Sequence, residues 1–137
     1  MPSLLRRRLL LASSLAVAAA LLAGCAQTAA APESTAAATH TVTDARGEVA
    51  VPDAPKRVVA LEPLELDTAV ALGVTPVGAA VAATTTGIPS YLGVVDVATV
   101  GTVAEPDLEA IAALKPDLIL GTEARHSKLY DQLSAIA

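Results

Sequence analysis

The sequence predicts an α/β fold, in which a small parallel sheet is flanked by helices and preceded by an amino-terminal β-hairpin. Two observations predict it. Short apolar runs alternate along the chain with segments whose apolar residues recur at helical spacing, and strands that alternate with helices favour a parallel sheet with right-handed crossovers. Before these runs, polar and apolar residues alternate on both sides of a turn, which is the pattern of a hairpin.

The hairpin is predicted over residues 40–52, "HTVTDARGEVAVP". Val42 alternates with polar residues, residues 45–47 form a turn, and the alternation resumes through Val49 and Val51. The chain contains no Phe or Trp and only two Tyr. The core must therefore be built from Leu, Ile, Val and Ala.

Four apolar runs predict the strands of the parallel sheet. They are too short for helices and have the composition of strands that are buried on both faces. The predicted strands are residues 57–61, 77–81, 94–100 and 117–122.

Three segments predict helices. The first opens at Pro63, since proline suits the first turn of a helix, and ends at Gly73. The second begins at residues 105–107 and ends at residues 115–116, with Leu108, Ile111 and Ala112 facing inward. The third has an apolar face made by residues spaced four and three apart, Leu129, Leu133 and Ile136.

The amino terminus has the pattern of an export signal. Three arginines at residues 6–8 precede an apolar stretch at residues 9–23, which is shorter than the roughly 20 residues of a membrane-spanning helix. The run Leu-Ala-Gly-Cys that ends at Cys25 looks like a bacterial lipobox, in which the cysteine receives a lipid. We therefore expect a signal peptide over 1–24, a flexible tether over 25–39 and a folded part over 40–137, with Sec export favoured over the twin-arginine route.

Composition and motifs exclude several function classes. The formal net charge is −5 and becomes more negative without the signal arginines, so a nucleic-acid partner is not expected. The sequence has no nucleophile elbow, phosphate loop or zinc-protease motif, and we expect no enzymatic activity. Two distant histidines, His40 and His126, do not make a metal site. His126 is expected to be a polar residue at a helix start.

Ligands of parallel α/β sheets bind beyond the carboxyl ends of the strands. Four segments fall there: Glu62, residues 83–87, residues 101–102 and residues 122–126. Only the last holds a fixed cation, Arg125, whose planar guanidinium suits an anionic ligand. The alternatives are that Arg125 is solvated or pairs with Glu123. The acidic residues at the first helix start, Glu62, Glu65 and Asp67, are expected to complement the helix dipole.

Four segments, in order and at this spacing, resemble the amino-terminal lobe of the iron-siderophore substrate-binding proteins of ABC importers, which are related to haem and cobalamin binders. The segments are "TVTDARGEVAVPDAPKRVVAL", "ALGVTPVGAA", "VGTVAEPDLEAIAALKPDLILG" and "RHSKLYDQLSAIA". The family has two α/β lobes joined by a rigid helix, with the ligand between them. Since two lobes need roughly twice this length, we expect the chain to be a fragment that holds the first lobe.

The resemblance also implies residue roles. Arg125 occupies the place of an arginine that contacts the anionic oxygens of the iron complex, and Tyr91 is placed to line the same cleft or to pack ordinarily. Glu109 occupies the place of a glutamate that docks on the membrane permease, although a carboxylate there also suits the helix dipole. No resident cofactor is implied.

We therefore expect a monomeric, lipid-anchored protein on the extracytoplasmic face of the cell membrane. It binds a ferric siderophore and delivers it to an ABC permease. A haem or cobalamin binder of the same family, and a truncated lipid-anchored interaction module without transport activity, are the alternatives.

Overall fold

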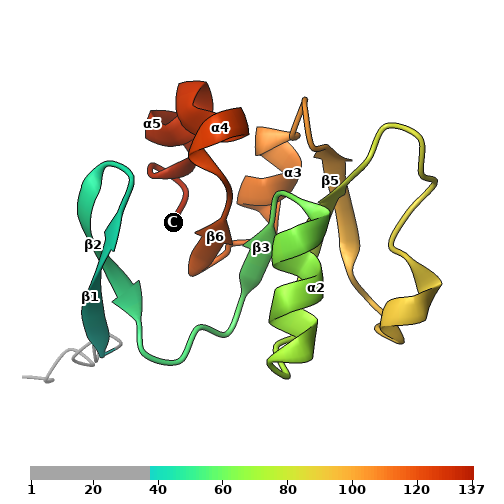
Figure 1. Ribbon diagram of the computed structural model, residues 1–137, viewed down its shortest axis with the longest axis horizontal. Helices are drawn as coiled ribbons and strands as arrows, with labels where there is room; N and C mark the ends of the chain where they lie inside the picture. Colours follow the sequence, from blue (N-terminus) through green and yellow to red (C-terminus); the bar gives the residue numbers. More distant parts are fainter. Residues whose placement is uncertain (1–37) are drawn as a thin grey trace, which may run out of the picture. The chain divides into compact units, whose positions relative to one another are not determined.

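The computed structural model describes residues 38–137, which belong to one compact unit, Ala36–Ala137. The predicted signal peptide, the lipidation at Cys25 and the tether up to residue 37 lie outside the described residues. Figure 1 shows the order of the elements along the chain. They are β1 (Thr39–Asp44), β2 (Gly47–Pro52), β3 (Val58–Ala60), α2 (Pro63–Ala71), β4 (Gly78–Val81), the 3₁₀ helix η1 (Ser90–Leu92), β5 (Ala98–Thr102), α3 (Leu108–Ala113), β6 (Leu118–Leu120), α4 (Glu123–His126), the 3₁₀ helix η2 (Ser127–Leu129) and α5 (Tyr130–Leu133).

The main sheet has four parallel strands in the order β5-β4-β3-β6. At its centre, Val59 of β3 lies opposite Gly78 of β4 on one side and Ile119 of β6 on the other. All residues of β3 and β4 are buried, as expected for strands covered on both faces. The predicted fold class, a small parallel sheet with an amino-terminal hairpin, is confirmed.

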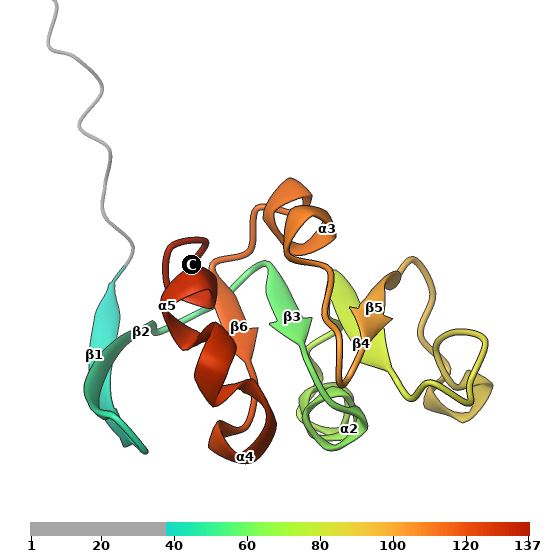
Figure 2. The ribbon, with the colours of Figure 1, turned by 90° about the horizontal axis from the view of Figure 1, so that it is seen from above.

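Helices cover both faces of the sheet. In Figure 2, α2 lies on the side opposite α3. One apolar cluster joins the sheet to α3 and α5, and its fully buried members include Val59, Leu61 and Ile111. A second cluster, around Leu66 of α2 and Ala79 of β4, fills the other face. Successive side chains of β3 therefore pack into two separate apolar cores, one on each face of the sheet.

The hairpin of β1 and β2 forms its own two-stranded antiparallel sheet. Asp44 pairs with Gly47 at its end, and the Asp44 carboxylate accepts the Arg46 backbone N–H at 2.7 Å. Every residue of β1 is exposed. Because no ladder joins the hairpin to β3–β6 in the described part of the chain, side-chain contacts must fix its position.

Two predicted elements differ from the structure at their starts. The strand predicted over 94–100 is β5, which begins only at Ala98, because Asp96 has a positive φ of 61° that interrupts extended backbone. The helix predicted from residue 105 begins at Leu108. There the Asp107 side chain accepts two backbone N–H groups as an N-cap.

Two predictions about helix faces and continuity were wrong. Ala112, expected to face inward, is exposed, whereas Ile111 is fully buried. The carboxyl-terminal helix is divided into α4, η2 and α5, because the backbone departs from helical geometry at His126 (φ −109°, ψ 4°) and residues Ser127–Leu129 then form a 3₁₀ turn before α5 begins. Its predicted apolar face nevertheless packs on the core.

Candidate functional site

Four loops converge where the parallel strands end. Glu62 follows β3, Ala82 follows β4, Val103 follows β5, and Thr122 follows β6 and leads into α4. Parallel strands bring their carboxyl ends to one edge of the sheet. The predicted ligand segments therefore lie near one another, although they are separated by up to about 60 residues in sequence.

The cation of this edge is paired with the carboxylate that follows β3. Arg125 Nε lies 3.4 Å from Glu62 Oε2, and the Thr122 hydroxyl donates to the other oxygen of the same carboxylate. The Glu62 side chain is only 16% exposed, whereas that of Arg125 is 60% exposed. Glu62 is therefore fixed from two sides, while much of the Arg125 side chain remains open to solvent.

His126 joins two of the converging loops. It is 5% exposed; its Nδ1 accepts the Thr122 backbone N–H at 3.2 Å, and its Nε2 lies 3.1 Å from the Val103 carbonyl oxygen. A carbonyl only accepts, so these partners assign the proton to Nε2 and the neutral form to the ring. His126 is both the last residue of α4 and the N-cap residue of η2, so the expected place at a helix start holds for the 3₁₀ helix, and its ring is buried.

A hollow of about 330 Å³ lies beside this network. Apart from Arg125 and Glu62, its lining consists of small or apolar residues and one threonine. The lining residues are Glu62, Pro63, Ala82, Ala83, Thr102, Val103, Ala104 and Arg125. The loops after β3, β4 and β5 thus border an open hollow in which a small ligand can bring anionic oxygens near the guanidinium.

A second hollow, of about 300 Å³, lies between the hairpin, β6 and α5. Its charged lining residues are the carboxylates Asp44, Asp117 and Glu123, and Asp117 already accepts the backbone N–H groups of Lys56 and Arg57. With no fixed cation in its lining, this hollow suits an anionic ligand less well than the space beside Arg125.

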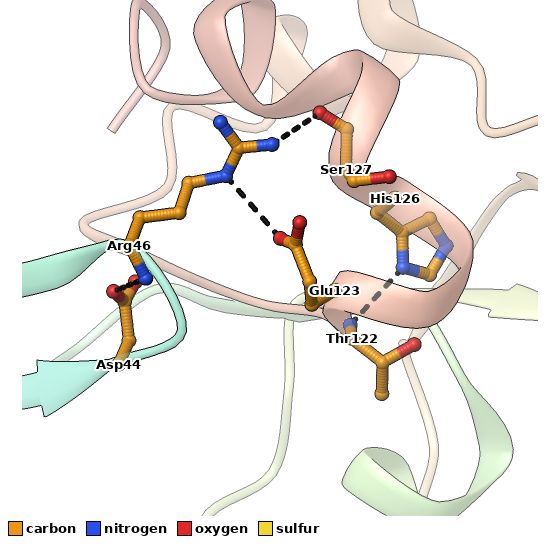
Figure 3. A network of polar contacts seen from close by, with 6 residues as sticks. All are labelled: Asp44, Arg46, Thr122, Glu123, His126 and Ser127. Carbon is orange, nitrogen blue, oxygen red and sulfur yellow. Dashed lines mark hydrogen bonds and ion pairs between the residues drawn. The ribbon is translucent and has the colours of Figure 1, made fainter.

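Arg46 holds the hairpin beside this second hollow. Its guanidinium donates to Glu123 at 3.2 Å and to the Ser127 carbonyl at 2.7 Å, and lies 4.4 Å from the centre of the Tyr130 ring. Figure 3 shows the side chain reaching from the hairpin turn to α4. The alternative in which Arg125 pairs with Glu123 was therefore wrong, because Glu123 is the partner of Arg46.

Tyr91 lies away from Arg125, on η1. Its hydroxyl donates to both oxygens of Asp67 in α2, at 3.0 and 3.1 Å, and it is 72% exposed. The hydrogen bond to the Asp67 carboxylate raises the pKa of the Tyr91 phenol above its ordinary value of 10.0, since ionisation would place two negative groups together. Tyr91 is not among the residues that line either hollow, so the structure does not bring it to the Arg125 site.

Glu109 lies in the first turn of α3 and is exposed. Among residues 38–137, no ion pair includes it. Within the same range, no three His, Cys, Asp or Glu side chains come together as they would to hold a metal ion. No helix in this part of the chain is both long and apolar enough to span a bilayer.

Glu62 and His126 were both expected at the carboxyl edge of the sheet, but their partners were not predicted. Glu62 was expected to complement the helix dipole, and it is a partner of Arg125 and Thr122. The ring of His126 packs beside Gly121, where a Cβ atom would lie 3.2 Å from His126 Nδ1. Both roles depend on contacts with segments that are distant in sequence, and the local spacing of apolar residues cannot predict such contacts.

Residues 58–137 match the family described as "Periplasmic binding protein". The chain is 45% identical over 95 residues to the Fe(3+)-citrate-binding protein YfmC of Bacillus subtilis, an alignment that covers 69% of this chain and 30% of that protein. It is 46% identical over 99 residues to the putative ABC transporter substrate-binding lipoprotein YhfQ of the same organism, covering 70% of this chain and 31% of the relative.

A solved structure shares the fold. The crystal structure of Staphylococcus aureus SirA complexed with staphyloferrin B superposes with a TM-score of 0.66 and 43% sequence identity, over 72% of this chain and 35% of that one. The chain thus spans about a third of the length of the relatives that it matches.

Proposed function

The chain belongs to the periplasmic binding protein family, and from this premise we propose that it supplies the amino-terminal lobe of a substrate-binding component of an ABC importer for ferric siderophores. In this role the protein binds its ligand reversibly on the extracytoplasmic side and passes it to a permease. It does not transform the ligand.

The names of the relatives support this ligand class. YfmC is named for ferric citrate, YhfQ for an ABC transporter, and SirA was crystallised with staphyloferrin B. A lipid on Cys25 would keep such a protein at the membrane that holds the permease, and the exposed Glu109 is the residue that we propose docks there. Tyr91 remains a proposed ligand contact, which would require a ligand that extends beyond the hollow.

The observation that carries the proposal is the position of Arg125. It is the one cation in the lining of the hollow at the carboxyl edge of the described sheet, and more than half of its side chain is exposed. A guanidinium donates two parallel hydrogen bonds to carboxylate-like oxygens. Ferric chelates of the siderophore class present such oxygens, so Arg125 supplies the recognition that the proposed ligand needs.

Substitution of Arg125 tests the proposal. We expect Arg125→Ala to weaken binding of ferric citrate by at least about tenfold, the equivalent of one charge-assisted hydrogen bond, and Arg125→Lys to restore part of the loss. Isothermal titration calorimetry on the purified protein measures both affinities. Lys128→Ala is the matched control, because Lys128 is an exposed cation three residues away and lines neither hollow.

Equal affinities of the wild type and Arg125→Ala would remove Arg125 from the site. A wild type that binds no ferric chelate but retains its fold would favour the interaction-module alternative. Preference for haem or cobalamin over every ferric chelate would keep the family role and change the ligand.

A further inference from the structure

Glu62 is the carboxylate that lies against Arg125, inside the same hollow. We propose that Glu62 is the positioning residue of the ligand-binding arginine: it holds the Nε side of the guanidinium so that the terminal nitrogens remain available to the ligand. This inference rests on the proposed function and adds to it the residue that orients the recognition group and the side from which the ligand approaches.

Glu62 is anchored through both its backbone and its carboxylate. It lies between the fully buried Leu61, which follows β3, and Pro63, which opens α2, so its backbone is fixed between two packed elements. Its two carboxylate oxygens have different partners, the Thr122 hydroxyl and Arg125 Nε. A carboxylate that is 16% exposed and held by Thr122 has little freedom to follow the arginine, so the arginine is oriented by the carboxylate.

The pairing with Glu62 leaves the terminal hydrogen-bond donors of the Arg125 guanidinium available. The guanidinium has five N–H donors, of which one is on Nε. Within residues 38–137, the contact with Glu62 is the only ion pair of Arg125, and it involves Nε. The pairing therefore leaves the end of the fork, Nη1 and Nη2, for two parallel hydrogen bonds with an incoming pair of oxygens.

The charges that line the hollow determine how a ligand can approach Arg125. The hollow is lined by one positive and one negative side chain, so its formal charge is zero. Attraction by net charge is weak in such a site, and recognition depends on oriented donors. A ligand oxygen on the Nε side would meet the Glu62 carboxylate and be repelled. A ligand of the proposed class therefore presents a pair of its oxygens end-on to the fork.

The experiment compares three substitutions. Glu62→Gln keeps the shape of the side chain and removes its charge. Thr122→Val removes the hydroxyl that anchors Glu62. Glu123→Gln is the matched control, because it makes the same change of charge two residues from Arg125 but on the carboxylate that pairs with Arg46.

Two readouts are used. Calorimetry with ferric citrate gives affinities, and ¹⁵N relaxation of the Arg125 Nε–H group gives the order of the side chain without any ligand. We expect Glu62→Gln to weaken ferric citrate binding about fivefold through lost preorganisation, Thr122→Val to weaken it about threefold, and Glu123→Gln to leave it within about twofold. Nε order should fall in the first two variants only.

A double-mutant cycle separates positioning from general damage to the fold. If Glu62 acts through Arg125, then Glu62→Gln added to Arg125→Ala changes affinity less than about twofold. Unchanged or tighter binding by Glu62→Gln, or unchanged Nε order, would overturn the inference while Arg125 kept its role. If the wild type binds no ferric chelate, the proposed function fails, and the relaxation measurement still decides whether Glu62 orders Arg125.

Discussion

Single side chains at the carboxyl edge are fixed by partners that are distant in sequence. The Thr122 hydroxyl contacts Glu62, 60 residues earlier, and the His126 ring contacts the Val103 carbonyl, 23 residues earlier. The position of Arg125 near a strand end could be predicted, because apolar runs locate strand ends and the carboxyl ends of parallel strands share an edge. Its partner could not, since local sequence suggested only Glu123, which the fold places beside Arg46, and gave no sign that Glu62 lies next to Arg125.

The Tyr91–Asp67 pair yields a prediction at this scale. The raised pKa of Tyr91 means that this pair contributes stability below pH about 10, the ordinary tyrosine value, and loses it as the pH rises through the folded-state pKa. Asp67→Asn should lower the pKa of Tyr91 toward about 10, because it removes the negative acceptor. Ultraviolet absorbance of tyrosinate against pH measures the shift.

Tyr91→Phe provides the control for this titration, because it leaves Tyr130 as the one remaining tyrosine. Subtracting its curve isolates Tyr91 in the wild type and in Asp67→Asn. Identical Tyr91 curves in both proteins would contradict the hydrogen bond.

At the scale of elements, the sequence located strands and helices better than it located their ends. The apolar runs at β3, β4 and β6 stood out because these strands are covered by other parts of the fold. The start predicted for β5 was too early because Asp96 has a positive φ. A glycine often marks such a conformation in a sequence, but here the residue is an aspartate. The last helix is interrupted at His126. The buried ring of this residue contacts the Thr122 backbone N–H and the Val103 carbonyl, and the second of these contacts forms only in the folded chain.

The attachment of the hairpin through Arg46 gives the prediction for elements. Arg46→Ala should reduce the free energy of unfolding by about 1–2 kcal/mol, since it removes a partly exposed ion pair, a hydrogen bond to Ser127 and a cation–π contact. Arg46→Lys should recover only part of this, because an ammonium lacks the planar fork. Denaturant unfolding measures stability, and hydrogen exchange measures protection of the hairpin amides.

Lys56→Ala is the control for Arg46, since Lys56 is an exposed cation in the adjacent loop whose backbone, and not its side chain, bonds to Asp117. It should leave hairpin protection unchanged. Equal protection of the hairpin amides in Arg46→Ala and the wild type would show that other contacts hold the hairpin.

At the scale of the whole molecule, the two residues to which we assign proposed roles are exposed on different elements, Arg125 on α4 and Glu109 on α3. The proposed ligand binding and the proposed permease docking can therefore be tested separately by mutation. The family could be inferred from ordered sequence segments. The contacts of Arg125 and Thr122 with Glu62 could not, because they arise only when loops from separate strands meet.

Substitution of Glu109 tests this separation. Glu109→Arg should leave ferric citrate affinity unchanged and reduce cellular iron uptake by at least about fivefold, because a reversed charge at a docking surface opposes association. Uptake of radioactive iron by cells that lack their own copy of the protein measures the effect.

The control makes the same charge reversal on the hairpin, at exposed Glu48. Glu48→Arg should transport normally. Loss of uptake in both variants would indicate a general effect of charge, and normal uptake by Glu109→Arg would remove Glu109 from the docking surface.

The strand order β5-β4-β3-β6 also determines the sequence of events when the chain folds. The hairpin needs only neighbouring residues and can close as soon as it has been synthesised. β3, whose three residues are all buried, lies between two strands that are made later and gains its second neighbour only when β6 has emerged. Until then its Val-Val-Ala backbone is an open, apolar edge, the kind of segment that pairs with other chains. Completion of β6 is therefore the step at which the nascent protein ceases to be prone to aggregation through β3.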